Sequence, residues 1–157
     1  MSKIRLTPAK FARSLIKRAG GITRAVDKGI ETGAHRGMAI LVARTPSGAT
    51  SKMRQSWSVN GKGRRVEIHN DAPYAGIVEK GARPHPVNKE GIAAITHWAR
   101  RKLGLNAVDA EGLAQGVAWK LRRKGQKPTH FVRDSMDDLR DALADEVARE
   151  LKKVDPR

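Results

Sequence analysis

Apolar side chains recur every three or four residues along the first third of the chain, which is the spacing of one face of an α-helix. This helix is predicted to begin at Thr7-Pro8, where a capping hydroxyl precedes a proline suited to the first helical position. It is predicted to end at Thr45-Pro46, because proline cannot continue a helix. Gly20-Gly21 is a place where it can kink or split. The apolar positions are Phe11, Leu15, Ala19, Ile22, Val26, Ile30, Ala34 and Leu41.

Small residues form a second stripe on the same helix at steps of four: Ala25, Gly29, Gly33 and Gly37. One interpretation is close packing against another helix, within the chain or across a subunit boundary. The other is that the glycines are tolerated on a weak helix, at a cost of up to about 1 kcal/mol each. We favour the second, because it needs no partner. Charged neighbours exclude a membrane interpretation of the GxxxG spacing.

Strict alternation of apolar and polar residues replaces the helical period over residues 55–60 and 64–69, which predicts two strands. Between them, Asn60-Gly61-Lys62-Gly63 is a strong turn signal, so the pair is predicted to be an antiparallel hairpin. The side chains predicted to face inward are Trp57, Val59, Val66 and Ile68.

A short helix is predicted over residues 74–80, and Gly81 is predicted to end it. Residues 82–87 are expected to be extended, because prolines at 84 and 86 exclude a helix. The inward side chains of the short helix are predicted to be Tyr74, Ile77 and Val78.

Residues 88–127 are predicted to be an inserted pair of helices, the first closed by Gly104 and the second by Gly125. A final helix is predicted from about His130 to Lys153. Its apolar stripe consists of Val132, Met136, Leu139, Leu143, Val147 and Leu151. The 157 residues suffice for one domain with its own core, so we predict a single domain over residues 1–157.

The net charge of +16 is the strongest feature of the composition. It indicates contact with nucleic acid or with an acidic protein surface, or a well-solvated basic surface, and charge alone does not choose between them. The charge is uneven: residues 1–66 contain only Asp27 and Glu31 as acids, whereas the final helix is rich in Asp and Glu. Such ends can pair within a subunit or between subunits.

The absence of cysteine excludes disulfides, thiolate catalysis and zinc–thiolate sites. No apolar run approaches the roughly 20 residues that cross a bilayer, so no membrane partner is expected. The segment Met1–Arg5 lacks the apolar core of a signal peptide. We therefore expect a protein made, and kept, in the cytoplasm or in a particle assembled there.

No group of residues has the spacing of a catalytic or metal site. His85 with Glu79 is the nearest metal candidate, and prolines flank that histidine. There is no nucleophile elbow and no phosphate-binding glycine loop. We expect no enzymatic activity, no cofactor and no metal.

Nucleic-acid binding is the main alternative function. Residues 98–102 and 120–127 are basic clusters in the predicted helical pair. A helix-turn-helix needs a turn of three or four residues, and the connection from Gly104 to Ala110 is predicted to be longer. The cations are therefore interpreted as a surface that attracts phosphates or acids without reading sequence.

Four segments, in this order, carry a resemblance to a known family. They are Thr45-Pro46 with Gly48, the run Met53-Arg54-Gln55-Ser56-Trp57, the run Tyr74-Ala75-Gly76-Ile77-Val78-Glu79-Lys80-Gly81, and the entry to the final helix, Lys127-Pro128-Thr129-His130-Phe131-Val132. Together they resemble the tail-completion and head–tail joining proteins of long-tailed phages, the gene-product-ten-like family. The chain departs from the family pattern at Ser47-Gly48-Ala49-Thr50 and at Ala82.

The resemblance implies an α+β subunit in which a small antiparallel sheet carries the long N-terminal helix and the C-terminal helix on one side. It implies a structural virion protein at the head–tail junction or tail end, assembled in the host cytoplasm. The implied partners are further copies of the chain in a ring of six, the head–tail connector, and tail tube or tail terminator proteins. DNA contact is expected only through non-specific charge.

The resemblance also assigns roles to residues. Those expected to define the fold are Trp57, Tyr74, Val78, Glu79, Gly81 and Phe131. Those expected to contact partners lie in two loops and are Ser47, Lys52, Arg83, His85 and Asn88.

Overall fold

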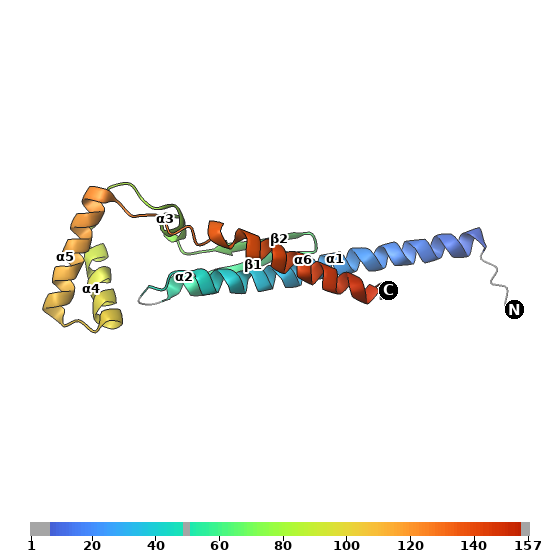
Figure 1. Ribbon diagram of the computed structural model, residues 1–157, viewed down its shortest axis with the longest axis horizontal. Helices are drawn as coiled ribbons and strands as arrows, with labels where there is room; N and C mark the ends of the chain where they lie inside the picture. The colour runs from blue at the N-terminus through green and yellow to red at the C-terminus, as the bar shows by residue number, and fades with distance from the viewer. Residues whose placement is uncertain (1–6, 49–50, 155–157) are drawn as a thin grey trace. The chain divides into compact units, whose positions relative to one another are not determined.

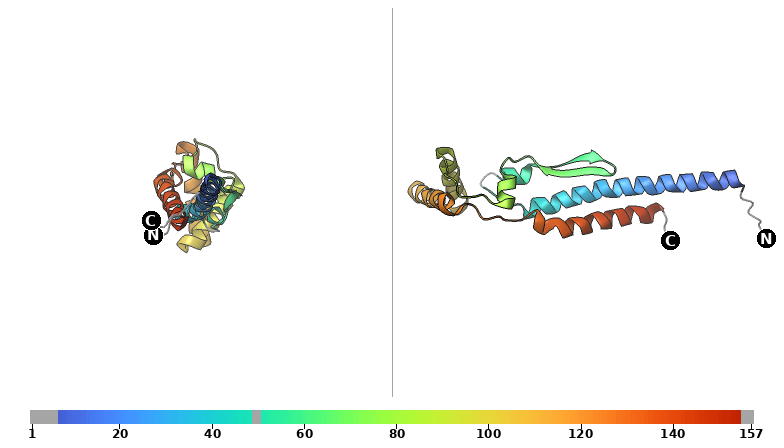
Figure 2. Two further views of the ribbon diagram at one scale, coloured as in Figure 1. Left: turned by 90° about the vertical axis from the view of Figure 1, so that its right-hand side faces the viewer. Right: turned by 90° about the horizontal axis from the view of Figure 1, so that it is seen from above.

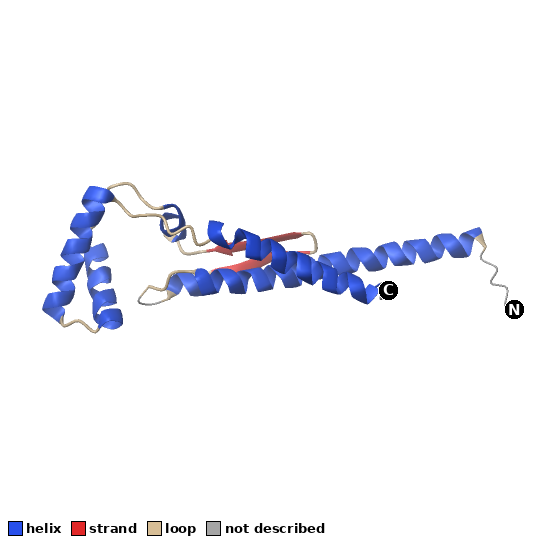
Figure 3. Cartoon of the chain, in the orientation of Figure 1, coloured by secondary structure: helices blue, strands red, loops and turns tan. Residues whose placement is uncertain are grey.

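The computed structural model describes residues 7–48 and 51–154. Helices predominate, and the strands form one two-stranded antiparallel sheet, which confirms the α+β prediction (Figures 1 and 3). The predictions for Met1–Arg5 and for Ala49-Thr50 lie outside the described residues. The elements are α1 (Pro8–Arg44), α2 (Lys52–Gln55), β1 (Trp57–Lys62), β2 (Arg65–Asn70), α3 (Ala75–Lys80), α4 (Lys89–Leu103), α5 (Ala107–Lys124), the 3-10 helix η1 (Arg133–Ser135) and α6 (Met136–Val154).

The chain divides into two compact units. Unit 1 contains α1 as far as Ile40, residues 59–69 of the hairpin, and α6. Unit 2 contains residues 41–58 and 70–135, and therefore α2, α3, α4 and α5. The single domain over residues 1–157 stays a prediction.

In unit 1, α6 lies antiparallel to α1 along the stripe of small residues (Figures 1 and 2). A methyl group added at Gly29 would lie 2.6 Å from the Cα of Val147, and one added at Gly33 would lie 3.0 Å from the Cα of Leu143. Tolerated glycine on a weak helix, the interpretation favoured from sequence, is therefore wrong. The glycines allow two helix backbones of the same chain to approach closely. The helix α1 also runs unbroken through Gly20-Gly21.

The hairpin packs against the same two helices. At Gly37, an added methyl group would meet the Cδ1 of Ile68 on β2 at 3.3 Å and the side chain of Leu139 on α6 at 3.5 Å. The predicted turn over residues 60–63 is displaced, because Gly61 belongs to β1 and the turn falls at Gly63-Arg64. The Gly63 N–H donates to the Glu31 carboxylate (2.7 Å), which ties this tip to α1.

Ion pairs join α1 to α6 within the chain. Glu146 and Glu150 of α6 are 4% and 8% exposed. Arg36 lies 3.3 Å from the carboxylate of Glu146, and Lys28 lies 3.5 Å from that of Glu150. Lys153, hydrogen-bonded to Glu150, holds the pKa of that carboxyl below its ordinary value. Part of the charge asymmetry seen in the sequence is therefore satisfied inside one subunit.

In unit 2, α4 and α5 pack together through alanines at Ala99, Ala110 and Ala114, all fully buried. As predicted, Gly104 and Gly125 end the two helices, with φ of 68° and 70°. The connection between the helices is only residues 104–106, because the side chain of Asn106 accepts the Asp109 N–H and starts α5 early. The predicted longer connection, used against a helix-turn-helix, is wrong.

The last helix begins later than predicted. His130 has φ of 52°, and its N–H donates to the carbonyl of Glu79 (3.1 Å). The Thr129 N–H likewise donates to the carbonyl of Val78 (3.1 Å). These bonds hold the segment against α3, so helical geometry starts only at η1 and α6.

Candidate assembly surfaces

The motif segments meet in unit 2 around a group of side chains that we call the motif cluster: Thr45, Arg54, Trp57, Glu79 and Phe131. Thr45, just after α1, has no exposed surface. Its hydroxyl donates to the carbonyl of Leu41 (2.6 Å) and accepts the indole N–H of Trp57 (2.8 Å). Its own carbonyl accepts from Nε of Arg54 (2.7 Å). The first two motif segments are thus bonded to each other.

Aromatic packing brings in the fourth segment. The rings of Trp57 and Phe131 meet edge to face, with centroids 6.4 Å apart and planes at 79°. Phe131 forms a small buried core with Met53 and Ala72. Side chains packed against this core are Trp57, Ala75, Val78 and Val132. The predicted inward facing of Trp57 and Val78 agrees with this packing.

Glu79 links the third segment to the fourth. Its two carboxylate oxygens accept the backbone N–H groups of Val132 (2.9 Å) and Arg133 (3.1 Å) at the start of η1. A carboxylate placed there satisfies N–H groups that a helix leaves without internal partners. The bonds of Glu79 are those of a helix cap, and its carboxylate is not paired with His85.

Gly81 occupies a position that only glycine suits. Its φ is 77°, and an added methyl group would lie 2.5 Å from the carbonyl oxygen of Gln126 and 2.9 Å from the nitrogen of Pro128. The next residue, Ala82, pairs with Gln126 through two backbone hydrogen bonds of 3.0 and 2.8 Å. The glycine therefore lets two distant parts of the chain pass closely.

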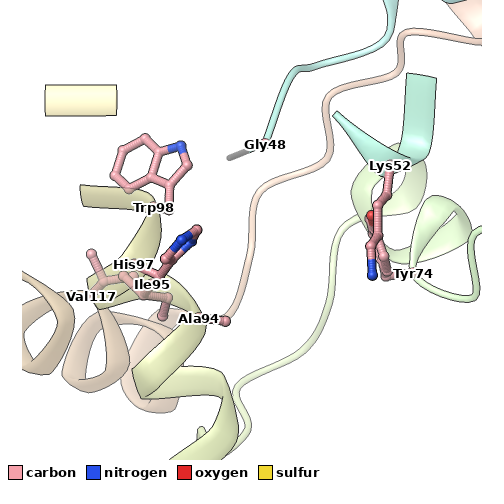
Figure 4. Close-up of a pocket in the computed structure, with 8 residues that line it drawn as sticks. All are labelled: Gly48, Lys52, Tyr74, Ala94, Ile95, His97, Trp98 and Val117. Carbon is pink, nitrogen blue, oxygen red and sulfur yellow. The ribbon is translucent and has the colours of Figure 1, made fainter. Parts of the chain in front are cut away.

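Tyr74 and Ile77 do not face inward as predicted; they are 41% and 47% exposed. With only six residues, α3 buries one narrow side, and Val78 occupies it. Tyr74 lines an open hollow of about 680 Å³ with Lys52, across from His97 and Trp98 (Figure 4). The polar groups there are an ammonium, a phenol, an imidazole and an indole N–H.

All five residues predicted to contact partners are exposed: Ser47, Lys52, Arg83, His85 and Asn88. Asn88 also caps α4, because its side-chain oxygen accepts the Gly91 N–H (2.9 Å). The His85 ring nitrogen Nδ1 lies 2.9 Å from the carbonyl oxygen of Arg83. Sequence reasoning missed the capping role, although an asparagine directly before an apolar helix signals it. Contact with partners stays a prediction for all five.

Within the described ranges, no three or more His, Asp or Glu side chains gather in a way that could hold a metal ion. None of the helices described there is long and apolar enough to cross a membrane.

The basic surface predicted in the helical pair includes an aromatic side chain that sequence reasoning did not single out. Trp119 on α5 is 59% exposed, and the guanidinium of Arg123 lies 4.8 Å from the centre of its ring. No acidic residue occurs from Gly112 to Arg133. The cations of this stretch are Lys120, Arg122, Arg123, Lys124, Lys127 and Arg133.

A second exposed surface lies at the start of α1. In unit 1, this helix continues past the end of α6 (Figures 1 and 2). We call residues 8–20 the α1 arm. Three large apolar side chains of the arm are exposed: Phe11 (52%), Leu15 (51%) and Ile16 (72%). Single exposed apolar residues are ordinary on protein surfaces, but a cluster on one helix indicates a contact surface.

Comparison with known families gives one match. Residues 9–81 match the family model described as "HK97-gp10_like: Bacteriophage HK97-gp10, putative tail-component". The match spans the long helix, the hairpin and the first three motif segments, and the segment Lys127–Val132 lies outside it. Comparisons with curated proteins and with solved structures gave no match. Residues 9–81 are thus similar to the HK97-gp10-like family of bacteriophage tail components, which confirms the resemblance predicted from the motifs.

Proposed function

We propose that the protein is a structural component of a tailed phage that acts at the junction of head and tail, or completes the tail, as a ring of six copies. The observation that carries the proposal is the match of residues 9–81 to a family of phage tail components. In the virion its partners would be further copies of itself, the head–tail connector, and tail tube or tail terminator proteins.

Two features of the molecule support a role in assembly. The motif cluster consists of hydrogen bonds and packing that hold the backbone. Several exposed apolar side chains lie on the start of α1 (Phe11, Leu15, Ile16) and on the basic helical pair (Leu103, Val108, Trp119), which are surfaces suited to partners.

Deletion of the gene from the parent phage tests the proposal. We expect filled heads and separate tails to accumulate, with infectivity restored by the gene supplied in trans. Electron microscopy of the lysate and a plaque count give the result. Normal infectious particles made without the protein would exclude the proposed role.

Binding to DNA phosphates without sequence specificity is a second candidate function. The observation that favours it is the acid-free stretch over residues 112–133, with Trp119 exposed among its cations. Lysine and arginine contacts to phosphates release counterions, so affinity would fall steeply with salt and would not depend on sequence.

A filter-binding titration over a series of salt concentrations tests this alternative. Replacement of Arg122, Arg123 and Lys124 by serine is expected to weaken binding and to flatten the salt dependence. Replacement of Lys10, Arg13 and Lys17 in the α1 arm removes the same charge elsewhere and is the matched control. A salt-resistant preference for one DNA sequence would instead indicate a regulator.

A further inference from the structure

We propose that the apolar face of the α1 arm docks into a groove between α1, β2 and α6 of a second copy of the chain, and so joins copies head to tail. This inference names a contact for the proposed ring, and it rests on the proposal that copies of the chain associate.

The groove lies in unit 1 and has a volume of about 210 Å³. Its floor and sides are almost entirely apolar, and its lining residues are Ile30, Gly33, Ala34, Gly37, Val66, Ile68, Met136, Leu139, Arg140 and Leu143. Met136 and Leu143 are 39% and 38% exposed, so apolar surface reaches the rim. An apolar cavity of about 150 Å³ is known to accept benzene. The groove therefore has room for a phenylalanine ring.

The arm presents side chains of matching character on a single face. Steps of four and seven residues lead from Phe11 through Leu15 and Ile22 to Gly29 and Gly33, so these positions share one side of α1. From Ala25 onward α6 covers this side: Ala25 is 6% exposed, and a methyl group at Gly29 would lie 2.6 Å from the Cα of Val147, whereas Ile22 is still 42% exposed. The arm continues the same side, with Phe11 and Leu15 exposed and Arg18, seven residues after Phe11, beside them.

The arm of a given copy cannot reach its own groove. The helix α1 is unbroken from Pro8 to Arg44, and Gly33 lines the groove. At 1.5 Å per residue, Phe11 lies about 33 Å along the helix axis from Gly33. Any arm that fills the groove must therefore come from another copy.

Charge favours the groove over a second arm as the binding partner. The stretch from Pro8 to Val26 contains five cations and no acid: Lys10, Arg13, Lys17, Arg18 and Arg24. Two arms packed together would bring these like charges close. The first turns of α6, beside the groove, expose Asp137, Asp138, Asp141 and Asp145, of which Asp137 and Asp145 also pair with Arg140 and Arg36 of the same chain. Exposed ion pairs add roughly 0–1 kcal/mol each, so the apolar contact supplies most of the affinity and the charges set the orientation.

Arm and groove are different surfaces, so the contact is heterologous. Each copy has one arm to give and one groove to offer, and such contacts close into rings when the rotation between copies permits. The arm-to-groove contact can therefore extend to oligomers larger than a dimer, whereas an arm-to-arm contact stops at two copies.

Disulfide cross-linking of introduced cysteines tests the contact. The chain has no cysteine of its own, so every disulfide must come from the introduced residues. The double variant carries Phe11→Cys in the arm and Leu143→Cys at the groove. A disulfide requires Cα atoms within about 7 Å, which the arm and groove of one copy cannot satisfy. Oxidation of the purified protein at rising concentration, and of assembled particles, should give a ladder of dimers, trimers and larger species that reducing agent collapses to monomer.

The matched control is Lys17→Cys with Leu143→Cys, since Lys17 lies on the polar side of the arm; it should give no ladder. Cross-linked dimers from Phe11→Cys alone would show that arms pair with each other and would overturn the proposal. Absence of the ladder in both the purified protein and the particles would also overturn it. Equal melting temperatures of the reduced variants and the parent show that the variants are folded.

A second measurement separates this contact from the proposed function. Phe11→Ser with Leu15→Ser should reduce self-association in sedimentation at least tenfold without lowering the melting temperature. If the parent associates and this variant associates equally well, the contact is wrong while the ring stands. If the gene proves dispensable for infectious particles but the ladder forms, the contact stands and the phage role fails.

Discussion

The motif cluster of unit 2 and the α1 arm of unit 1 use similar residues in opposite ways. In the motif cluster, Trp57 and Phe131 pack on each other, and the polar groups beside them are hydrogen-bonded. Across the described residues, no buried side-chain nitrogen or oxygen lacks a partner. In the arm, Phe11, Leu15 and Ile16 face solvent. Aromatic and aliphatic side chains thus stabilise the subunit in one place and are left available for contact in the other.

Truncation of Trp57 is expected to give the largest effect and would confirm the first half of this comparison. Trp57→Ala removes the edge-to-face contact with Phe131 and the hydrogen bond to Thr45, and should cost about 3–5 kcal/mol of unfolding free energy. Urea denaturation measures it. Trp119→Ala, at an exposed tryptophan, is the matched control and should change stability by less than about 0.5 kcal/mol. Equal losses of unfolding free energy in the two variants would show that Trp57 does not stabilise the subunit more than an exposed tryptophan does.

Two glycines of α1 sharpen the boundary between the arm and the part of the helix that α6 covers. Gly29→Ala places a methyl group 2.6 Å from the backbone of Val147, and such overpacking should cost about 1–3 kcal/mol. Gly20→Ala meets only the end of the Arg24 side chain at 3.7 Å, so its better helix propensity should stabilise by up to about 1 kcal/mol. Thermal melts should show a lower melting temperature for Gly29→Ala and a higher one for Gly20→Ala than for the parent. A stabilising Gly29→Ala would mean that α6 does not pack closely there.

Substitution of Glu79 tests whether hydrogen bonds, in addition to aromatic packing, contribute to the stability of the motif cluster. Glu79→Ala leaves the N–H groups of Val132 and Arg133 without their acceptor and should cost about 0.5–2 kcal/mol. Glu67→Ala, an exposed glutamate on β2, is the control and should be near neutral. Chemical denaturation compares the two variants, and equal stability would show that water replaces the carboxylate at no cost.

The smallest expected effect concerns the ion pairs that fasten α6 to α1 below the arm. Lys153 and Lys28 lower the pKa of Glu150, so its contribution is fully present above the unfolded-state value near 4.3 and is lost as the pH falls through the lower folded-state value. The parent should therefore lose more stability on acidification than Glu150→Gln does. Urea midpoints measured at neutral and acidic pH compare them, and parallel losses would exclude this contribution.

Local patterns predicted most of the fold. The period of apolar residues located α1, the helical pair and most of α6, and glycines at 81, 104 and 125 marked the ends of three helices. Predictions failed where a hydrogen bond between residues far apart in the sequence determined the local geometry. The turn of the hairpin follows the bond between Gly63 and Glu31, and the start of α6 follows the bonds of residues 129–133 to α3. The four-residue helix α2 gave no periodic signal at all.

The candidate surfaces were harder to predict, because exposure is a property of what a neighbouring element leaves uncovered. Phe11 and Ile30 belong to one apolar stripe in the sequence, yet only the structure shows that α1 continues past the end of α6 and that Phe11 is exposed (Figure 2). Trp119 similarly lies in a helix whose alanines form the buried side. In the glycine stripe, the sequence indicated two interpretations, and only the closeness of Val147 and Leu143 decided between them.

Ala82 and Gln126 pair with each other, so the chain enters and leaves the helical pair at adjacent points. The helical pair is therefore an insertion whose two ends are held together. Doubling the length of a loop raises the entropic cost of closing it by only about 0.6 kcal/mol, so a change in the length of this insertion should alter the stability of the subunit little. We therefore expect that α4 and α5 can be lengthened, exchanged or deleted while Gly81, Glu79 and Phe131 keep their contacts. The helical pair is where we expect the protein to accommodate a different binding partner with the fewest changes elsewhere.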